Sequence, residues 1–380
     1  MREITSNLDK ELESHIGSNS LDKSAAFPVN SYQRLVAIIA KLAFLNKDHL
    51  LFFRGQDRDY RSKAGSTTIY PKIYRGDYLP QREINYRFEL LHEASKQLKH
   101  LFTIEEVDGF KELSRKKYIQ WSILQHYEVC ATPFLDITHS IRVACSFAQH
   151  FSKHSNAYVY TFGLPYITHR ITINSEHDLV LIRLLSICPP DALRPYFQEG
   201  YLTGTEDITI EYDSKTELDF KNRLIAKFEI PNNDSFWKPG FSAIPKNVLF
   251  PSSDRVKDLC TSIKLKIKNE LMPGQIGEFI QLWTKLESDL ISRARYYDSD
   301  IFTLRSAINQ LVESDQISTD SLMTFEGLRK FRNILVHEPK KVSPEELLKY
   351  INTIDGFSRA FKNQNRNNIP NSKNDHYEEE

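Results

Sequence analysis

The residues whose side chains are best suited to ligand binding lie in one stretch, 124–148, LQHYEVCATPFLDITHSIRVACSFA. The apolar residues before Asp136 predict the end of a strand, and a helix with a small apolar face is predicted to begin near Ser140. Asp136, Thr138 and Ser140 alternate along the connection, where helix amides point outward and ligands are often bound. His126 adds an imidazole to the same region. The alternative is structural, with Asp136 and Ser140 capping the helix and His126 satisfied in the core.

A second set of polar residues interrupts an apolar helix predicted within 328–351, LRKFRNILVHEPKKVSPEELLKYI. Arg332 and His337 are about 140 degrees apart on an ideal helix, whereas Asn333 and His337 share a face. The three side chains therefore do not all belong to one solvated face. In the alternative interpretation the motif is structural and Arg332 is bonded to carbonyls of the helical bundle.

Composition limits the classes of function. A chain of 380 residues with 40% hydrophobic content is long enough for two or three domains. Fifty basic and fifty acidic residues cancel, so any binding of nucleic acid must depend on a local surface. We find no leader-like apolar run at the start and no apolar stretch of about eighteen residues, and we expect a cytoplasmic protein without a membrane partner. The four cysteines, Cys130, Cys145, Cys188 and Cys260, form no CxxC pair, which predicts reduced structural thiols and no metal site.

The elements expected to position the first stretch are mixed helices and strands. Ser31 is a predicted cap for a helix that ends near Leu45, and apolar residues 50–53 predict a strand that closes on Arg54 and Gly55. The other predicted elements of this region are an irregular loop over 57–80, helices over 81–102, 111–125 and 178–185, and strands over 157–162 and 224–231.

The pattern becomes purely helical near Lys264. Residues 275–295 carry apolar side chains at helical spacing, and three further helices are predicted after short polar connections. Ser-Pro-Glu-Glu at 343–346 is a capping box that begins the last helix. The Asn-rich segment 363–380 has no apolar face and is expected to be disordered, while 1–29 is expected to be a polar helical lead.

Four segments in this order resemble the FRG domain, a family named for its Phe-Arg-Gly motif. They are FRGQ at 53–56, the stretch 124–148, RPYFQEGYLTGT at 194–205, and NVLFPSSDRVKDL at 247–259. The resemblance covers residues 30–262. Where the family usually has Gly-Leu-Pro-Thr-Arg-Leu-Leu-Asp-Trp, this chain keeps Asp136 but not the Arg or the Trp.

The layout of that family is reminiscent of ADP-ribosyltransferases, which present an Arg or His, then a Ser or Thr, then a Glu or Gln on successive elements. Here Arg54, then Thr138 and Ser140, then Gln198 and Glu199 occur in that order. The resemblance implies that Arg54 binds a phosphate or ribose of NAD, that a hydroxyl positions the nicotinamide ribose, and that the amide or carboxylate stabilises the cationic sugar. The remaining expected ligand-binding residues are Gly55, Gln56, His126 and Tyr127.

Residues 264–362 resemble the HEPN superfamily, whose signature is Arg, a polar residue and then His near the end of a helix in a four-helix bundle. The resemblance implies a homodimer formed through the helical domain and a metal-independent endoribonuclease that needs no cofactor. His337 would act as general base or acid toward the ribose 2′-hydroxyl and Arg332 would stabilise the scissile phosphate. Asn333 would orient the reacting group, and the product would carry a 2′,3′-cyclic phosphate.

The sequence therefore predicts an α+β protein in which a mixed α/β FRG domain, similar to ADP-ribosyltransferases, precedes an all-α four-helix HEPN-like domain. We expect an effector of the toxin, abortive-infection or phage-defence kind, with one module that senses or modifies a ligand and one that cleaves RNA. Two alternatives remain open. One is an ADP-ribosyltransferase or NAD-consuming effector whose helical domain only dimerises, and the other is a binding and assembly protein without catalysis.

Overall fold

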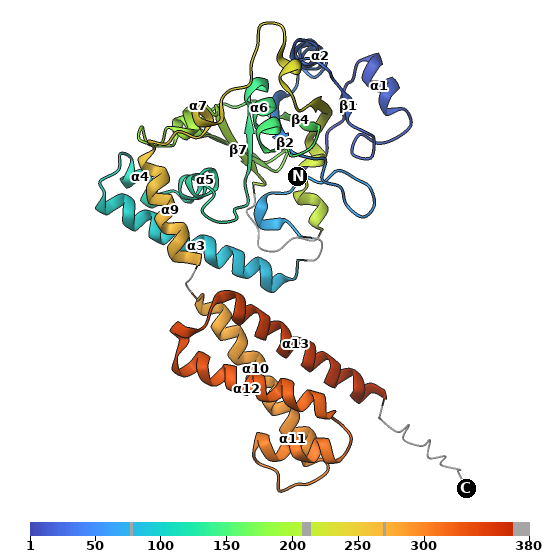
Figure 1. The fold of residues 1–380 in the computed structure, drawn as a ribbon, viewed down its shortest axis with the longest axis vertical. Helices are drawn as coiled ribbons and strands as arrows, with labels where there is room; N and C mark the ends of the chain where they lie inside the picture. The colour runs from blue at the N-terminus through green and yellow to red at the C-terminus, as the bar shows by residue number, and fades with distance from the viewer. Residues whose placement is uncertain (77–78, 207–213, 269–270, 368–380) are drawn as a thin grey trace, which may run out of the picture. The chain divides into compact units, whose positions relative to one another are not determined.

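The computed structural model describes residues 1–76, 79–206, 214–268 and 271–367 (Figure 1). The chain divides into two compact units, unit 1 over Met1–Ile267 and unit 2 over Lys268–Glu380. Separate hydrophobic clusters fill the two units, because no cluster of buried side chains in the described residues includes members of both. The change of pattern predicted near Lys264 lies close to this division.

Unit 1 is built on an eight-stranded sheet whose order is β1-β8-β4-β2-β3-β7-β6-β5. Strands β1 and β8 are parallel, and the other described pairs are antiparallel. The fold is therefore a mixed α/β unit followed by a helical region. The strands are β1 Phe27–Pro28, β2 Leu50–Gln56, β3 Leu135–Thr138, β4 Asn156–Leu164, β5 Ile171–Asn174, β6 Leu179–Arg183, β7 Gly200–Gly204 and β8 Leu224–Pro231.

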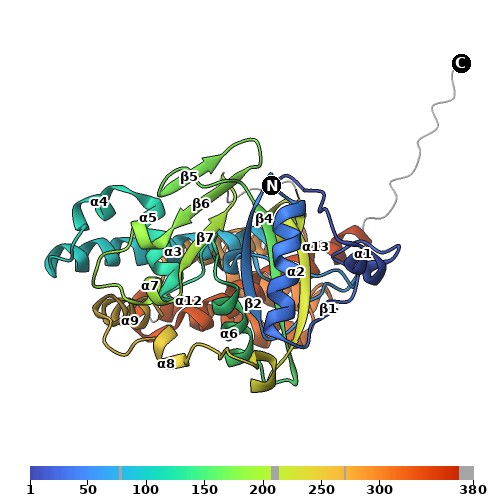
Figure 2. The same ribbon diagram turned by 90° about the horizontal axis from the view of Figure 1, so that it is seen from above.

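The sheet has a weak junction between β2 and β3. Strand β2 pairs with β4 over its whole length, whereas it pairs with β3 through Phe53 and Thr138. Figure 2 shows β5, β6 and β7 on one side of this junction and β2 and β4 on the other. Because the ladder is short here, polar side chains at the ends of β2 and β3 are left free to line a cavity.

Helices cover the sheet in two groups. The first group, α2 and α6, packs with Leu51 and Phe53 of β2 and with apolar residues of β4 and β8. The second, α3, α5 and α9, packs with Val180, Ile182 and Leu202 of β6 and β7. The α-helices of unit 1 are α1 Lys10–Ile16, α2 Tyr32–Leu45, α3 Gln81–Ile104, α4 Phe110–Arg115, α5 Lys117–His126, α6 Ile141–Phe151, α7 Arg194–Phe197, α8 Lys246–Leu249 and α9 Arg255–Lys268. Short 3₁₀ turns lie at Lys72–Tyr74, Leu184–Ser186, Lys215–Leu218, Phe220–Arg223 and Asp234–Trp237.

Several sequence predictions are confirmed by these elements. The Ser31 hydroxyl accepts a hydrogen bond from the amide of Arg34 at 3.3 Å and caps α2, which ends at Leu45 as expected. The strand predicted over 224–231 is β8. The strands predicted over 50–53 and 157–162 exist but are longer, as β2 and β4.

Three predictions about elements were wrong. Residues 178–185 were expected to be helical, but Leu179–Arg183 is the strand β6, and four of its five side chains are buried. The helix expected over 111–125 is two helices, α4 and α5, separated at Lys116. The apolar residues before Asp136 were expected to end a strand, yet β3 begins at Leu135 and contains Asp136 and Thr138.

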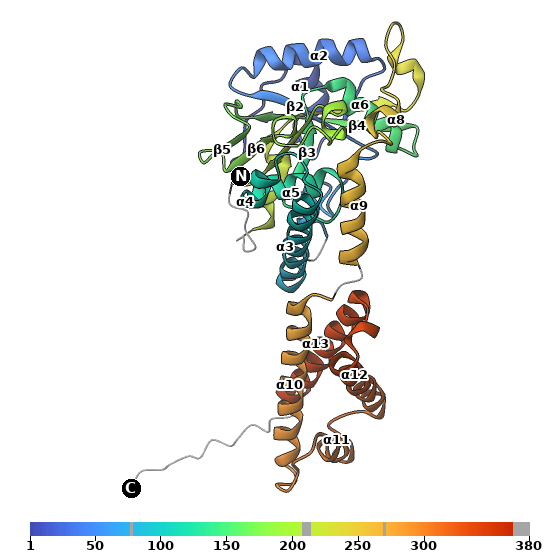
Figure 3. The ribbon, with the colours of Figure 1, turned by 90° about the vertical axis from the view of Figure 1, so that its left-hand side faces the viewer.

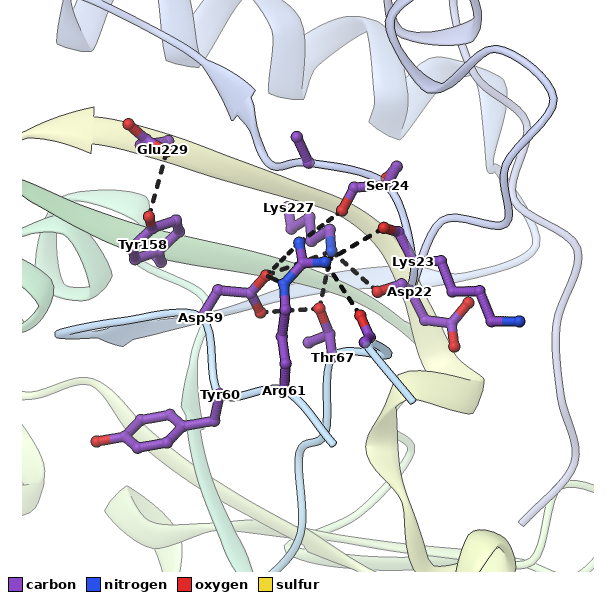
Figure 4. A network of polar contacts seen from close by, with 12 residues as sticks. Asp22, Lys23, Ser24, Asp59, Tyr60, Arg61, Thr67, Tyr158, Lys227 and Glu229 are labelled. Atoms are coloured by element: carbon purple, nitrogen blue, oxygen red, sulfur yellow. Dashed lines mark hydrogen bonds and ion pairs between the residues drawn. The ribbon is translucent and has the colours of Figure 1, made fainter. Parts of the chain in front are cut away.

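Residues 1–29, the predicted polar helical lead, belong to unit 1 and contain α1. The amino group of Met1 pairs with Asp178 at 2.6 Å, and Leu12 is buried in the core beneath α2. Figure 4 shows a network in which the buried Lys227 of β8 donates to the Thr67 hydroxyl at 2.7 Å and to the main-chain oxygen of Asp22 at 3.1 Å. This network ties the N-terminal segment and the loop after β2 to the sheet.

Unit 2 is helical in its described residues (Figure 3). Apolar side chains from four helices form one core, with Phe279, Ala307, Phe331 and Leu347 among its buried members. The amide of Glu346 donates to the Ser343 hydroxyl at 3.1 Å, which confirms the predicted start of the last helix. That helix continues to Asn367, so the first part of the tail 363–380 is helical, and 368–380 lie outside the described residues. The helices are α10 Pro273–Arg295, α11 Leu304–Glu313, α12 Thr319–His337 and α13 Pro344–Asn367, with a 3₁₀ turn at Pro339–Lys341.

The cysteines are all buried and all free. Cys130, Cys188 and Cys260 belong to the cluster beneath α3 and α5, and Cys145 belongs to the cluster beneath α2. Burial raises the pKa of the Cys130 thiol to about 12 and raises the pKa of the other three further. The expectation of structural thiols is therefore confirmed for unit 1, which holds every cysteine of the chain.

Candidate functional site

A cavity of about 290 Å³ opens at the junction of β2, β3 and β7. Its walls come from the end of β2, the loop after it, the last turn of α5, strand β3, helix α6 and the α7–β7 connection. The side chains that line it are polar on the strand side and aromatic on the α6 side. The lining residues are Phe53, Arg54, Gly55, Gln56, Asp57, Tyr60, Arg75, Gln125, His126, Glu128, Asp136, Ile137, Thr138, Val143, Ala144, Phe147, Phe151, Arg194, Gln198, Gly200, Tyr201 and Phe250.

Two guanidinium groups line the cavity without a carboxylate partner among the described residues. Nη1 of Arg54 donates to the main-chain oxygen of Asp136 at 2.6 Å, while its buried Nε has no hydrogen-bond partner. Nε of Arg75 donates to the main-chain oxygen of Tyr70 at 2.9 Å. Burial lowers the pKa of Arg54 to about 10, which still leaves it charged at neutral pH. Unpaired, partly desolvated guanidinium groups favour an anionic ligand.

A hydrogen-bonded chain fixes the carboxylate of Asp136. The Thr132 hydroxyl donates to Oε1 of Gln125 at 2.5 Å, and Nε2 of Gln125 donates to Oδ2 of Asp136 at 2.6 Å. Oδ1 of Asp136 lies 3.5 Å from Nδ1 of His126. Burial raises the pKa of the Asp136 carboxyl, but His126, Arg54 and Gln125 outweigh that effect, and the pKa is lowered overall. Asp136 therefore presents a fixed negative charge to the cavity.

Phenyl rings form the opposite wall. Phe147 and Phe151 of α6 stack with ring centroids 5.9 Å apart, and Phe250 lies edge-on to Phe147 at 5.6 Å. The guanidinium of Arg194 lies 4.6 Å from the Phe250 centroid and pairs with Glu128 at 2.7 Å. Such a surface suits a flat, uncharged ring such as a nucleobase.

A second hollow, of about 650 Å³, shares Gln56, Tyr60 and Arg75 with the cavity. Its described lining includes Arg61 and Lys63. The loop that carries Tyr60 is held by the network in Figure 4, in which Arg61 pairs with Asp59 at 2.8 Å. Arg75 therefore lies where a ligand longer than the cavity would pass.

Most of the predicted ligand-binding residues converge on this cavity. Seven line it, and they come from four separate parts of the fold, β2, α5, β3 and the α7–β7 connection. The amide nitrogen of Gln198 donates to the main-chain oxygen of Leu249 at 2.8 Å, so that end of the side chain is occupied. The seven residues are Arg54, Gly55, Gln56, His126, Asp136, Thr138 and Gln198.

Three predicted residues do not line the cavity, and each has a structural task. Ser140 caps α6 by accepting from the amide of Val143 at 3.4 Å, which is the structural alternative given for it above. The Tyr127 hydroxyl donates to Asp254 at 2.8 Å. Glu199 adopts a φ of 44° in the turn before β7, and its main-chain oxygen accepts from the Thr138 hydroxyl at 3.1 Å. The Thr138 hydroxyl also accepts from the amide of Ser140, so it fixes the junction between β3 and α6.

The glycine of the FRGQ segment allows β2 to approach α6. A Cβ added at Gly55 would lie 2.0 Å from the main-chain oxygen of Ala144 and 2.7 Å from the amide of Ala148. No side chain fits there without moving the helix backbone. The small residues of α6 and Gly55 together place the phenyl wall beside Arg54.

Sequence reasoning missed several lining residues. Gln125 adjoins the predicted His126, but an amide near a helix end is no specific signal. Arg75 lies in a segment predicted as irregular loop, and Phe250 and Arg194 are distant from the other residues along the chain. Only the fold shows that these residues face the same cavity.

The predicted residues of unit 2 lie at the end of α12. Asn333 and His337 are exposed, and Arg332 is half-buried beside the buried Phe331. Nη1 of Arg332 donates to Oδ1 of Asn333 at 3.2 Å, and its Nε is buried without a partner. Ile334 and Val336 in the same turn are also exposed, which leaves an apolar surface beside the polar residues.

The described residues contain no group of three or more His, Cys, Asp or Glu arranged to hold a metal ion. Within the same ranges no helix is long and apolar enough to cross a membrane. Searches against protein-family models, curated proteins and solved structures find no significant match to this chain. The chemistry of the two sites is therefore interpreted from their own geometry.

Proposed function

We propose that the cavity of unit 1 binds a nucleotide of the NAD class. The observation that carries this proposal is that the cavity is lined by two guanidinium groups, which have no carboxylate partner among the described residues, and by three phenyl rings. Arg54 and Arg75 would bind phosphate oxygens, and the rings of Phe147, Phe151 and Phe250 would stack on a base. The hollow that shares Arg75 gives room for a second nucleotide.

Cleavage of the glycosidic bond of NAD is the reaction that this arrangement supports best. As nicotinamide leaves, the ribose becomes positively charged, and a fixed carboxylate stabilises that charge. Asp136 supplies such a carboxylate in the cavity, whereas the Thr138 hydroxyl and the Gln198 amide nitrogen are already occupied. The order Arg54, Thr138, Gln198 along the chain supports an FRG-type domain related to ADP-ribosyltransferases over residues 30–262.

A second candidate function is RNA cleavage by unit 2. The observation that favours it is that Asn333 and His337 are exposed together on α12, with the guanidinium of Arg332 bonded to Asn333. His337 would move the proton of a ribose 2′-hydroxyl and Arg332 would neutralise the phosphate. In this proposal residues 264–362 are a HEPN-like domain that dimerises. The protein would then be a cytoplasmic effector of the toxin, abortive-infection or phage-defence kind.

The test is to incubate the purified protein separately with NAD and with total RNA and to measure the consumption of each. Arg54→Gln is expected to weaken NAD binding by about tenfold or more, because a charge-assisted hydrogen bond is lost. The matched control is Arg58→Gln, since Arg58 is exposed, pairs with the neighbouring Asp57, lies over the Tyr60 ring and does not itself line the cavity. His337→Ala is expected to abolish RNA cleavage, with His154→Ala as its exposed control.

The two proposed functions are tested by different measurements and can fail independently. If the wild-type chain does not bind NAD, or if Arg54→Gln and Arg58→Gln behave alike, the nucleotide proposal is wrong. If RNA is untouched, or if His337→Ala cleaves it as the wild type does, the ribonuclease proposal is wrong.

A further inference from the structure

His126 is the most deeply buried titratable side chain of the cavity that lacks a hydrogen bond. Its exposed fraction is 3%, and neither ring nitrogen makes a hydrogen bond of normal length to the described residues. A buried polar group without a hydrogen bond is energetically costly, so native structures rarely keep one without a reason. Because His126 lines the cavity, a bound ligand is the group that would satisfy it.

Asp136 is the nearest polar neighbour of this imidazole, but the two do not satisfy each other. Their closest atoms, Nδ1 and Oδ1, are 3.5 Å apart, which is too long for a normal hydrogen bond. Gln125 holds the other carboxylate oxygen, so the orientation of Asp136 is set without the help of His126. The carboxylate is 41% exposed, and Oδ1 is left to accept a hydrogen.

The two side chains together require a ligand group that can both donate and accept a hydrogen bond. The carboxylate accepts only, and burial lowers the pKa of His126, so its neutral ring carries one N–H and one lone pair. A hydroxyl meets both demands, since its hydrogen goes to Oδ1 of Asp136 and its oxygen accepts from the N–H of His126. A phosphate is repelled by the carboxylate, and the cavity already offers Arg54 and Arg75 to phosphates.

We propose that His126 and Asp136 together hold one ribose hydroxyl, so that the cavity selects ribonucleotides against their deoxy analogues. The inference rests on the proposed nucleotide site and specifies its ligand more closely. Arg54 and Arg75 bind the phosphates, the phenyl wall binds the base, and this pair binds the sugar. A ligand without the hydroxyl leaves the buried imidazole of His126 without a hydrogen bond and Oδ1 of Asp136 without its donor.

The experiment is calorimetric titration of the wild-type full chain with NAD and with analogues that each lack one ribose hydroxyl. One analogue is expected to bind about tenfold or more weaker than NAD, because sites built around a hydroxyl strongly reject ligands that lack it. Analogues that lack a hydroxyl elsewhere are expected to bind within about threefold of NAD. If every analogue binds as well as NAD, the pair holds another group, such as an amine, and the proposal is wrong.

Substitutions then assign the discrimination to the pair. Asp136→Asn and His126→Asn are expected to reduce the preference for NAD over the sensitive analogue to about threefold or less. His139→Asn is the matched control, because this histidine lies beside the same strand, stacks on Phe52 and does not line the cavity. Thermal unfolding of each variant shows whether it is folded. The wild-type titrations need no variant, so the proposal stays testable if one fails to fold.

The outcomes distinguish this inference from the function on which it rests. Absence of NAD binding overturns both the nucleotide site and the ribose contact. Binding without preference among the analogues leaves the nucleotide site standing and overturns the ribose contact alone. A preference that persists unchanged in Asp136→Asn and His126→Asn also overturns it.

Discussion

At the scale of single residues, five histidines of unit 1 share one electrostatic property. Burial has the largest influence on each of the five and lowers its pKa below the value of a free imidazole. A buried imidazolium loses hydration that the neighbouring groups do not replace. The folded chain therefore binds fewer protons at these sites than the unfolded chain. The residues are His49, His92, His126, His139 and His177.

We predict that the free energy of unfolding falls as the pH is lowered from about 6.5 toward 5, because the unfolded histidines then take up protons that the folded ones do not. Above about pH 6.5 the histidines are neutral in both states, and this contribution is fully present. Urea denaturation at pH 7.5, 6.5 and 5.5 measures the effect. His92→Gln should flatten the dependence, and a constant stability across this range would contradict the prediction. The carboxyls with a lowered pKa, such as Asp22 and Glu112, destabilise the fold only at more acidic pH.

The order of residue types along the chain predicted a large part of the candidate site. Arg54, Asp136 and Gln198 were named from sequence and line one cavity. Ser140 and Tyr127 were named on the same grounds and do not, because a serine before a helix serves equally well as its cap and a buried tyrosine needs a hydrogen-bond acceptor. Residue type alone does not separate these uses.

At the scale of elements, the errors have a common cause. The run Leu179–Arg183 is apolar on both faces, and periodicity does not distinguish a short buried strand from a turn of buried helix. The same ambiguity shifted the start of β3. Longer elements with a capping residue, such as α2, were predicted to the residue because periodicity and cap agree.

The close approach of β2 and α6 gives a prediction at this scale. Gly55→Ala is expected to lower the free energy of unfolding by about 2 kcal/mol or more, since a methyl group would overlap the backbone of Ala144. Gly277→Ala, in an exposed position of α10 with open space around it, is expected to raise stability by about 0.5–1 kcal/mol. Urea denaturation followed by circular dichroism compares the two. Equal effects would show that the approach of β2 to α6 is not tight.

At the scale of the whole molecule, the chain is two units with separate cores. Sequence predicted the mixed α/β unit and the helical region after it, because the hydrophobic period changes near Lys264. The incorporation of residues 1–29 into the sheet was not predicted. The segment 1–29 is mostly polar, and such a composition gives no signal for its few long-range contacts. Examples are Leu12, which packs under α2, and Phe27, which pairs with Phe228 of β8.

Because of where the cysteines lie, the rate of thiol labelling reports how often unit 1 opens. A thiol reagent reaches Cys130, Cys145, Cys188 and Cys260 only when unit 1 opens, since all four are buried and their raised pKa values keep them protonated. Unit 2 has no cysteine, so its opening does not contribute to the labelling. Where labelling follows the opening equilibrium, NAD at a hundred times its Kd should slow it about a hundredfold. An unchanged labelling rate would mean that NAD does not bind the closed unit.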